Sequence, residues 1–195
     1  MKTRLLSLLC CFIALSGSAQ SFAKSQKDLN IGFGFGNHYA GRGYNSSYPA
    51  ITLALDYGIT DEISLGGMIG FGGATYQYFY YDVCNNGNVA GNFSDTYRWS
   101  FTLLGFRGAY HFDKLIKVPQ LDAYAGLMLY DAFGRYSFTS TNPCRTKGLY
   151  SSNAYGGVYF AGFIGARYRF TDHFGVFLEL GYGLSAANFG LNYKF

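Results

Sequence analysis

Alternation of two kinds of residue along the chain is the feature that most constrains its fold. From Ile63 to Gly72, large apolar residues occupy the odd positions except Gly67, and they alternate with serine, glycine and methionine at even positions. A period of two places the two kinds on opposite faces of an extended strand, whereas a helix needs a period near 3.6. The alternation recurs in seven further stretches, so we predict an all-β chain of eight strands. These stretches are 30–36, 50–57, 97–112, 121–130, 160–170, 176–182 and 188–195.

One of these stretches contains a slip. In 97–112 the apolar residues occupy odd positions as far as Leu103 and even positions from Leu104 onward. An extra residue in one strand shifts the side chains that follow it to the other face. We therefore predict a β-bulge near Leu103 and Leu104.

The polar faces of these strands are too poor in charge for a surface that faces water. They carry mainly glycine, tyrosine, serine and asparagine, and only 13% of the chain is charged, about half the usual share. An inverted arrangement fits better, with the apolar face toward lipid and closure removing unpaired strand edges. We predict an eight-stranded antiparallel up-and-down transmembrane β-barrel. A soluble, lipocalin-like barrel with its aliphatic face inward is the alternative.

The first residues have the three-part pattern of a secretory signal peptide. Lys2 and Arg4 precede an apolar run over 5–15, and small or polar residues follow it. Cleavage after Ala23 or after Ala19 satisfies the small-residue rule; we take 1–23 as the signal and 24–195 as the barrel domain. Losing two basic residues lowers the net charge of +4 by two, which leaves no argument for nucleic acid as a partner.

The expected connections alternate between two sizes. Compact ones cover 58–62, 111–120 and 171–173, and Thr-Asp in two of them favours tight turns through side-chain to backbone hydrogen bonds. Long or polar ones cover 37–49, 74–96 and 133–156, and the last connection, near 185–187, is short. With both termini in the periplasm, the long connections would be extracellular.

The chain also resembles a known family. Its eight-strand pattern and its closing stretches, Leu178–Gly183 and Asn192–Phe195, are similar to small outer-membrane β-barrel proteins of the OmpA/OmpX-like type. The resemblance implies a cell outer-membrane location and contact with membrane lipid and lipopolysaccharide. It also implies a C-terminal signal for the outer-membrane assembly machinery, carried by Phe189, Leu191, Tyr193 and Phe195. Such barrels host unrelated activities, so the resemblance does not give the function.

Eight charged residues fall on the inward faces of the expected strands. An eight-stranded barrel is just wide enough for side chains to fill it. Charges inside it must pair, because an isolated buried charge is very costly. We predict a salt-bridged network that closes the lumen, with a narrow pore for ions or small solutes as the alternative. The eight residues are Asp56, Arg98, Arg107, Asp122, Arg167, Arg169, Glu179 and Lys194.

Two cysteines remain after the signal. Cys84 and Cys144 fall in neighbouring long connections. Export permits a disulfide, so we predict that they pair; two free thiols are the alternative. Two cysteines without nearby histidine do not make a zinc site, and we expect neither a metal nor another cofactor.

The histidines do not suggest catalysis. Hydrolytic chemistry needs a nucleophile, a base and an orienting carboxylate at one place. His38 is the only histidine on the expected outer side, whereas His111 and His173 are read as solvated turn residues. We predict that the chain is not an enzyme, and keep a lipid-modifying enzyme as a distant alternative.

Function is therefore sought in the connections, where binding residues concentrate. We predict a structural, adhesion or surface-binding role toward an extracellular ligand, such as anionic sugars or lipopolysaccharide phosphates. For the tyrosines, an extended hairpin is the alternative. The candidate binding residues are Tyr76, Tyr78, Tyr80, Tyr81, Arg135, Arg145 and Lys147.

Overall fold

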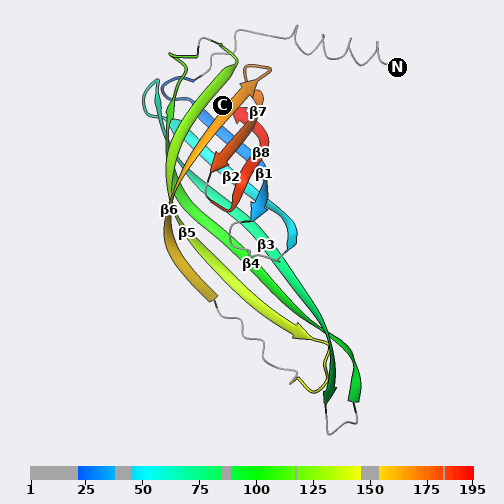
Figure 1. Ribbon diagram of the computed structural model, residues 1–195. Coiled ribbons are helices and arrows are strands. Elements are labelled where there is room, and N and C mark those ends of the chain that lie inside the picture. Colours follow the sequence, from blue (N-terminus) through cyan, green and yellow to red (C-terminus); the bar gives the residue numbers. More distant parts are fainter. Residues whose placement is uncertain (1–21, 38–44, 85–88, 117, 146–153, 182) are drawn as a thin grey trace, which may run out of the picture.

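The computed structural model shows eight antiparallel strands closed into one barrel (Figure 1). Each strand pairs with its neighbours in sequence, and β1 pairs with β8 to close the ring, which confirms the predicted fold class. The structure describes residues 22–37, 45–84, 89–116, 118–145, 154–181 and 183–195. The strands are β1 (Lys27–Asn37), β2 (Asn45–Gly58), β3 (Ile63–Cys84), β4 (Val89–His111), β5 (Leu121–Ser140), β6 (Ala154–Arg169), β7 (Phe174–Gly181) and β8 (Ser185–Lys194).

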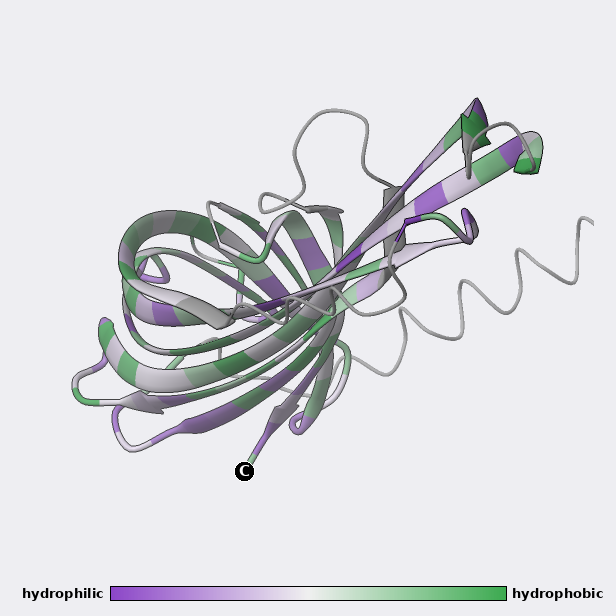
Figure 2. Ribbon diagram, turned by 90° about the horizontal axis from the view of Figure 1, so that it is seen from below, coloured by the Kyte–Doolittle hydropathy of each residue, from purple (hydrophilic) through white to green (hydrophobic). Residues whose placement is uncertain are grey.

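The apolar face of the strands points outward. In β7, Val176 and Leu178 are exposed while Phe177 and Glu179, between and beside them, are buried in the interior. Figure 2 shows the same alternation of hydrophobic and hydrophilic residues along the other strands. The aliphatic face is therefore not turned inward, as a lipocalin-like barrel would require. Among the described residues there is no helix long and apolar enough to cross a membrane.

The predicted bulge in β4 is absent. Pairing of β4 with β3 and with β5 runs without a register shift. Leu103 is 0% exposed and faces the lumen, while Leu104 is 58% exposed and faces outward. The apparent slip arises because β4 is apolar on both faces near these residues, where the barrel interior itself is apolar.

Of the expected long connections, 74–96 is largely strand, and 133–156 begins as strand. β3 and β4 remain paired as far as Cys84 and Val89, and β5 continues to Ser140. Tyrosine, phenylalanine and threonine are frequent here and favour strands. The three extensions, 74–84, 89–99 and 134–140, form what we call the projecting sheet, which stands away from the barrel at the bottom of Figure 1.

The opposite end of the barrel, which we call the short-turn end, carries the C-terminus and the compact turns (Figure 1). The Thr60 Oγ1 accepts a hydrogen bond from the backbone N of Ile63 at 3.0 Å, and the Thr171 Oγ1 accepts one from Phe174 at 2.9 Å. These bonds confirm the expected Thr-Asp turns. Lys114 joins two turns by pairing with Glu62, and this hydrogen bond raises the pKa of Lys114.

Closure depends on close approach of backbones at the β1–β8 seam. A Cβ on Gly190 would lie 2.0 Å from the Ile31 carbonyl oxygen, whereas a Cβ on the outward-facing Gly162 would meet nothing nearer than 3.8 Å. We expect Gly190→Ala to cost about 1–3 kcal/mol of folding free energy through overpacking, and Gly162→Ala to cost much less. Urea unfolding of both variants in detergent micelles measures this difference, and equal midpoints would contradict it.

Candidate functional site

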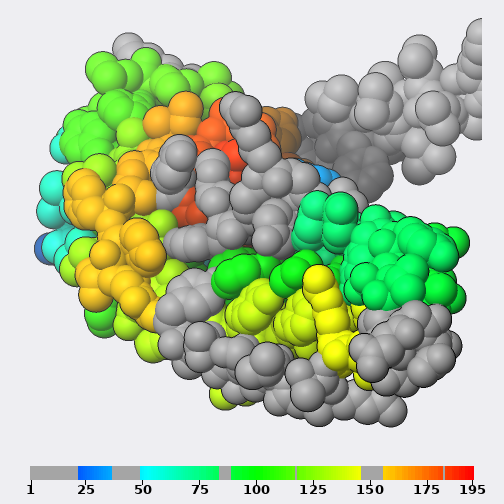
Figure 3. Space-filling view, turned by 60° about the horizontal axis from the view of Figure 1, so that its bottom comes forward, coloured from blue at the N-terminus to red at the C-terminus, as the bar shows by residue number. Residues whose placement is uncertain are grey.

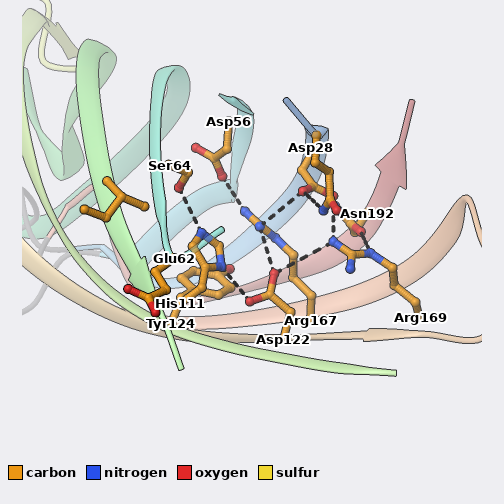
Figure 4. Close-up of polar contacts among 12 residues, drawn as sticks. Asp28, Asp56, Glu62, Ser64, His111, Asp122, Tyr124, Arg167, Arg169 and Asn192 are labelled. Atoms are coloured by element: carbon orange, nitrogen blue, oxygen red, sulfur yellow. Dashed lines mark hydrogen bonds and ion pairs between the residues drawn. The ribbon is translucent and has the colours of Figure 1, made fainter. Parts of the chain in front are cut away.

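Six of the eight predicted lumen charges lie inside the barrel near the short-turn end. They come from β2, β4, β5, β6 and β7, and each is at most 7% exposed. The inward position of alternate residues on each strand brings them to one level of the lumen, as Figure 4 shows for most of them. The six are Asp56, Arg107, Asp122, Arg167, Arg169 and Glu179.

Arg167 is the centre of this network. Its guanidinium pairs with Asp56, and its Nη1 lies 3.2 Å from Asp122 Oδ2 and 3.6 Å from Asp28 Oδ2 (Figure 4). Arg169 adds a second guanidinium, with its Nη2 2.9 Å from Asp28 Oδ1. Each buried charge therefore has an opposite charge in contact, which is the condition for keeping ions in a low-dielectric interior.

Arg107 extends the network away from the short-turn end. Its Nε lies 3.1 Å from Asp56 Oδ1, and its Nη2 donates to Glu179 Oε1 at 2.5 Å. The Tyr124 hydroxyl donates to the same carboxylate oxygen at 2.8 Å. Gly66 provides the room, since a Cβ there would lie 2.5 Å from Asp56 Oδ1.

Several members of the network were not predicted from the sequence. Asp28 was placed before the first strand, but β1 begins at Lys27, and Asp28 shares the inward face with Asn30. The Asn192 amide donates to Asp28 Oδ1 at 3.2 Å and to Asn30 Oδ1 at 2.9 Å. The even positions of Asp28, Asn30 and the glycines that follow were the signal that could have found them.

His111 is not a solvated turn residue. It ends β4 and is 1% exposed. Its Nδ1 lies 2.6 Å from Asp122 Oδ1 and its Nε2 lies 3.0 Å from Ser64 Oγ (Figure 4). Phe22 stacks on the imidazole with the ring centres 3.6 Å apart. The side chain was misread because 111–120 was taken as a compact connection, although His111 lies between the outward residues Tyr110 and Phe112 of the predicted strand.

Ser64, His111 and Asp122 are linked by hydrogen bonds in the same order as the serine, histidine and aspartate of a hydrolase triad. Ser64 is buried and Asp122 also contacts Arg167, so the three groups lie within the sealed network. Phe22 covers the imidazole from the short-turn end. Cleavage after Ala19 keeps this cover, whereas cleavage after Ala23 removes it.

Two predicted lumen charges are not buried in this network, one because it faces outward and one because it lies at the rim. Arg98 is exposed on the outward side of β4, because the expected bulge that would have turned it inward does not exist. Lys194 is half-buried at the short-turn rim, paired in register with Asp28.

The other half of the lumen is apolar. Phe101, Leu103 and Tyr130 are buried there and pack with Met68 and Leu184. Between this layer and the charges, a cavity of about 30 Å³ is bounded by Thr52, Met128, Phe163 and other residues. That volume accommodates about one water molecule. The described side chains thus fill the lumen.

The inner face of the projecting sheet is aromatic. It continues the lumen-facing side of β3, β4 and β5 beyond the barrel, and Figure 3 shows parts of β3 and β5 at this end. Neighbouring rings are in contact, for example Trp99 with Tyr136 at 4.6 Å and Tyr97 with Phe138 at 5.0 Å between ring centres. The face consists of Tyr76, Tyr78, Tyr80, Phe93, Tyr97, Trp99, Tyr136 and Phe138.

A charged pair lies against these rings. Asp95 is buried and pairs with Arg145, and it accepts a hydrogen bond from the Tyr80 hydroxyl at 3.1 Å. The Arg145 guanidinium lies over the Tyr80 ring, 5.0 Å from its centre. Tyr81 and Arg135 are exposed on the opposite face, and Lys147 lies outside the described residues. The predicted binding residues are therefore divided between two faces.

Cys144 is disulfide-bonded. Cys84 ends β3, but its side chain lies outside the described residues, so the Cys84–Cys144 pairing stays a prediction. Nearby, the Asn142 amide donates to Asp82 Oδ2 at 2.9 Å, which holds the segment after β5 against the tip of β3.

The residues of the expected assembly signal lie on β8 and at the chain end. Phe189, Leu191 and Phe195 are exposed on the outer face, and Tyr193 is partly exposed beside them. The described part of the chain contains no cluster of three or more His, Cys, Asp or Glu side chains that could hold a metal ion.

The closed ring, apolar outer face and charged lumen define the fold class of the small outer-membrane β-barrels. No protein-family model and no curated protein matches the sequence. The structure is similar to the outer membrane protein OprG from Pseudomonas aeruginosa, with 12% identity over 92% of this chain and 99% of OprG and a TM-score of 0.55.

Two further solved barrels are similar at lower TM-scores. The attachment invasion locus protein Ail of Yersinia pestis has 10% identity over 88% of this chain and 99% of Ail, with a TM-score of 0.49. The N-terminal β-barrel domain of Pseudomonas aeruginosa OprF has 17% identity over 88% of this chain and 98% of that domain, with a TM-score of 0.45. At these identities, the likeness to OprG shows the fold alone.

The network predicts a strong dependence on Arg167. Arg167→Met leaves three buried carboxylates without their central cation, and breaking such a cluster costs about 3–5 kcal/mol. Arg98→Met removes an exposed guanidinium and should change the free energy of unfolding by less than about 0.5 kcal/mol. Urea unfolding in zwitterionic micelles compares the two variants with the unsubstituted chain. An equal loss of unfolding free energy in both variants would contradict the central role of Arg167.

Proposed function

We propose that this chain is an integral outer-membrane protein whose projecting sheet binds a carbohydrate ligand at the cell surface, without catalysis. The observation that carries the proposal is the aromatic inner face of a sheet that continues from the barrel beyond its apolar belt. A smooth barrel with short connections at both ends would have no such surface.

The outward residues of β3 mark where the membrane ends. Ile63, Leu65 and Phe71 are exposed apolar residues, and the segment 63–71 matches the roughly 9–11 residues that a tilted strand needs to span a bilayer. Polar or small residues follow on the same face, at Thr75 and Gln77. We therefore place the end of the belt at Phe71, so that the projecting sheet would stand in water. Exposed apolar side chains return to this face only beyond the polar interruption, at Phe79, Tyr81 and Val83.

The orientation follows from the lengths of the connections. Outer-membrane barrels have short periplasmic turns and longer extracellular connections. The short-turn end would accordingly face the periplasm with both termini. The projecting sheet would face the outside. The outward aromatic residues of β8 would serve the assembly machinery, in keeping with the resemblance of the C-terminal stretch.

The chemistry of the projecting sheet favours carbohydrate. Aromatic rings offer broad apolar surfaces and tyrosine adds a polar hydroxyl, a combination suited to ligands with both apolar and hydroxyl-bearing faces. Sugar rings present both. The ion pair of Asp95 with Arg145 holds Tyr80 in place, and the continuous strands hold the rings in a fixed spacing.

The alternatives receive less support from the lumen. A pore needs a continuous water path, whereas charged and apolar layers fill the described lumen in succession. An enzyme needs substrate access to its nucleophile, whereas Ser64 is buried under the network. Both features favour a closed barrel that acts as a membrane anchor for the projecting sheet.

Membrane insertion is tested by gel migration. We expect the outer-membrane fraction to contain the protein, and unheated samples to migrate differently from boiled ones in SDS, because the closed hydrogen-bonded ring resists the detergent. Recovery from the soluble periplasm, with no heat-dependent shift, would contradict the proposed location.

Ligand binding is tested with two tyrosines of the same strand. Tyr78 is 51% exposed on the inner face, and Tyr81 is 67% exposed on the opposite face. On an oligosaccharide array, we expect Tyr78→Ala to weaken binding at least about tenfold, a loss of about 1.4 kcal/mol, and Tyr81→Ala to have little effect. The reverse order would assign recognition to the other face, and absence of any oligosaccharide signal would contradict a carbohydrate ligand.

A further inference from the structure

We propose that the outer wall of the barrel carries a binding site for one molecule of a phosphorylated glycolipid of the outer leaflet. An apolar groove would hold an acyl chain, and Arg98 and Arg135 would hold a phosphate. The inference rests on the proposed membrane location, but on residues other than those of the projecting sheet's inner face.

The groove lies on the lipid-facing wall across β2 to β6. Its volume is about 680 Å³, and almost all of its lining is apolar. Gly67 forms part of its floor, because it pairs with Leu55 on one side and Phe106 on the other. A Cβ on Gly67 would meet nothing nearer than 3.8 Å. A missing side chain among large ones thus makes a depression of the kind that an acyl chain can fill.

The two arginines lie just beyond this groove. Arg135 follows Phe133, a lining residue, by one outward position on β5. Arg98 pairs in register with Ser137, so it lies one outward position further along the neighbouring strand. Both side chains are exposed on the same outer face. Neither forms an ion pair with any residue that the structure describes.

The level of these arginines indicates the head-group region. On the outward faces of β4 and β5, the last large apolar residues of the belt are Leu104 and Phe133. Beyond them, the outward positions next to the two arginines are occupied by Ser100 and Ser137. Long cationic side chains at this level place their charge among lipid head groups. A guanidinium group can donate two parallel hydrogen bonds to two oxygens of one phosphate, which favours a phosphate over a neutral head group.

One acid lies in the groove and limits where the phosphate can sit. Asp131 lines the groove two outward positions from Arg135, and its Oδ1 accepts a hydrogen bond from the Gly157 backbone N at 3.2 Å. This carboxylate would repel a phosphate placed deeper in the groove. The phosphate is thereby restricted to the arginine end, with the acyl chain along Gly67.

The glycolipid and the chain's own variants provide the test. The full mature chain is reconstituted in phosphatidylcholine nanodiscs with a small fraction of lipid A, and native mass spectrometry counts the lipid A retained on the protein. We expect one retained molecule on the unsubstituted chain. The Arg98→Ala/Arg135→Ala double variant should retain at least about tenfold less. Gly67→Ile fills the groove and should also lose lipid A, whereas Gly162→Ile, at another open outward glycine, should keep it.

The outcomes separate this site from the proposed location. A chain that fails to insert into the nanodiscs overturns the membrane proposal itself. A chain that inserts, but retains lipid A equally in the double arginine variant, overturns the site alone. Equal retention of dephosphorylated lipid A would contradict binding of a phosphate by the two arginines. Equal retention of phosphatidylglycerol would contradict a site for a glycolipid, because any anionic lipid would then bind. Lys27→Ala, at an exposed position at the start of β1 and far from both proposed sites, controls for general loss of positive charge.

Discussion

The requirement that every backbone polar group find a partner within the ring organises this structure. Lipid offers no hydrogen bonds, so a sheet in a membrane must close on itself. Here the closure is made at the β1–β8 seam, where Gly32 faces Gly190 in register. Small residues at this seam allow the two backbones to approach. The narrow lumen follows from closing a ring of only eight strands, and the outward apolar face is the arrangement that a lipid-facing wall requires.

A ring of eight strands leaves a lumen that side chains must fill, and this chain fills it with a charged layer and an apolar layer. Near the short-turn end, three guanidinium groups meet four carboxylates, with His111 beside Asp122. Further along, aliphatic and aromatic side chains pack together. The charges of this layer depend on one another, because a single residue, Arg167, contacts three of the carboxylates. The apolar layer then separates these ions from the far end of the barrel.

The alternation along the chain was sufficient to predict the eight strands and the inward direction of six lumen charges. It failed where a local pattern had two physical explanations. β4 is apolar on both faces near Leu103, which resembles a bulge and turned Arg98 to the wrong side. Asp28 and His111 lie at strand ends, where alternation alone does not separate the last strand residue from a turn residue, although both occupy inward positions that continue the pattern. Contacts across the lumen, such as Arg167 with Asp56, join strands far apart in sequence and leave no local signal.

The proposed recognition surface is carried by strands rather than by loops. Tyr76, Tyr97 and Phe138 come from three strands whose register is already set within the barrel. Their rings therefore keep their spacing without a separate core, and ligand binding need not order a flexible segment first. Because side chains alternate between faces, the same strands present rings on one side and Arg98 and Arg135 on the other. The two proposed sites, for a ligand in water and for a lipid in the membrane, would thus lie on opposite faces of one extension of the barrel.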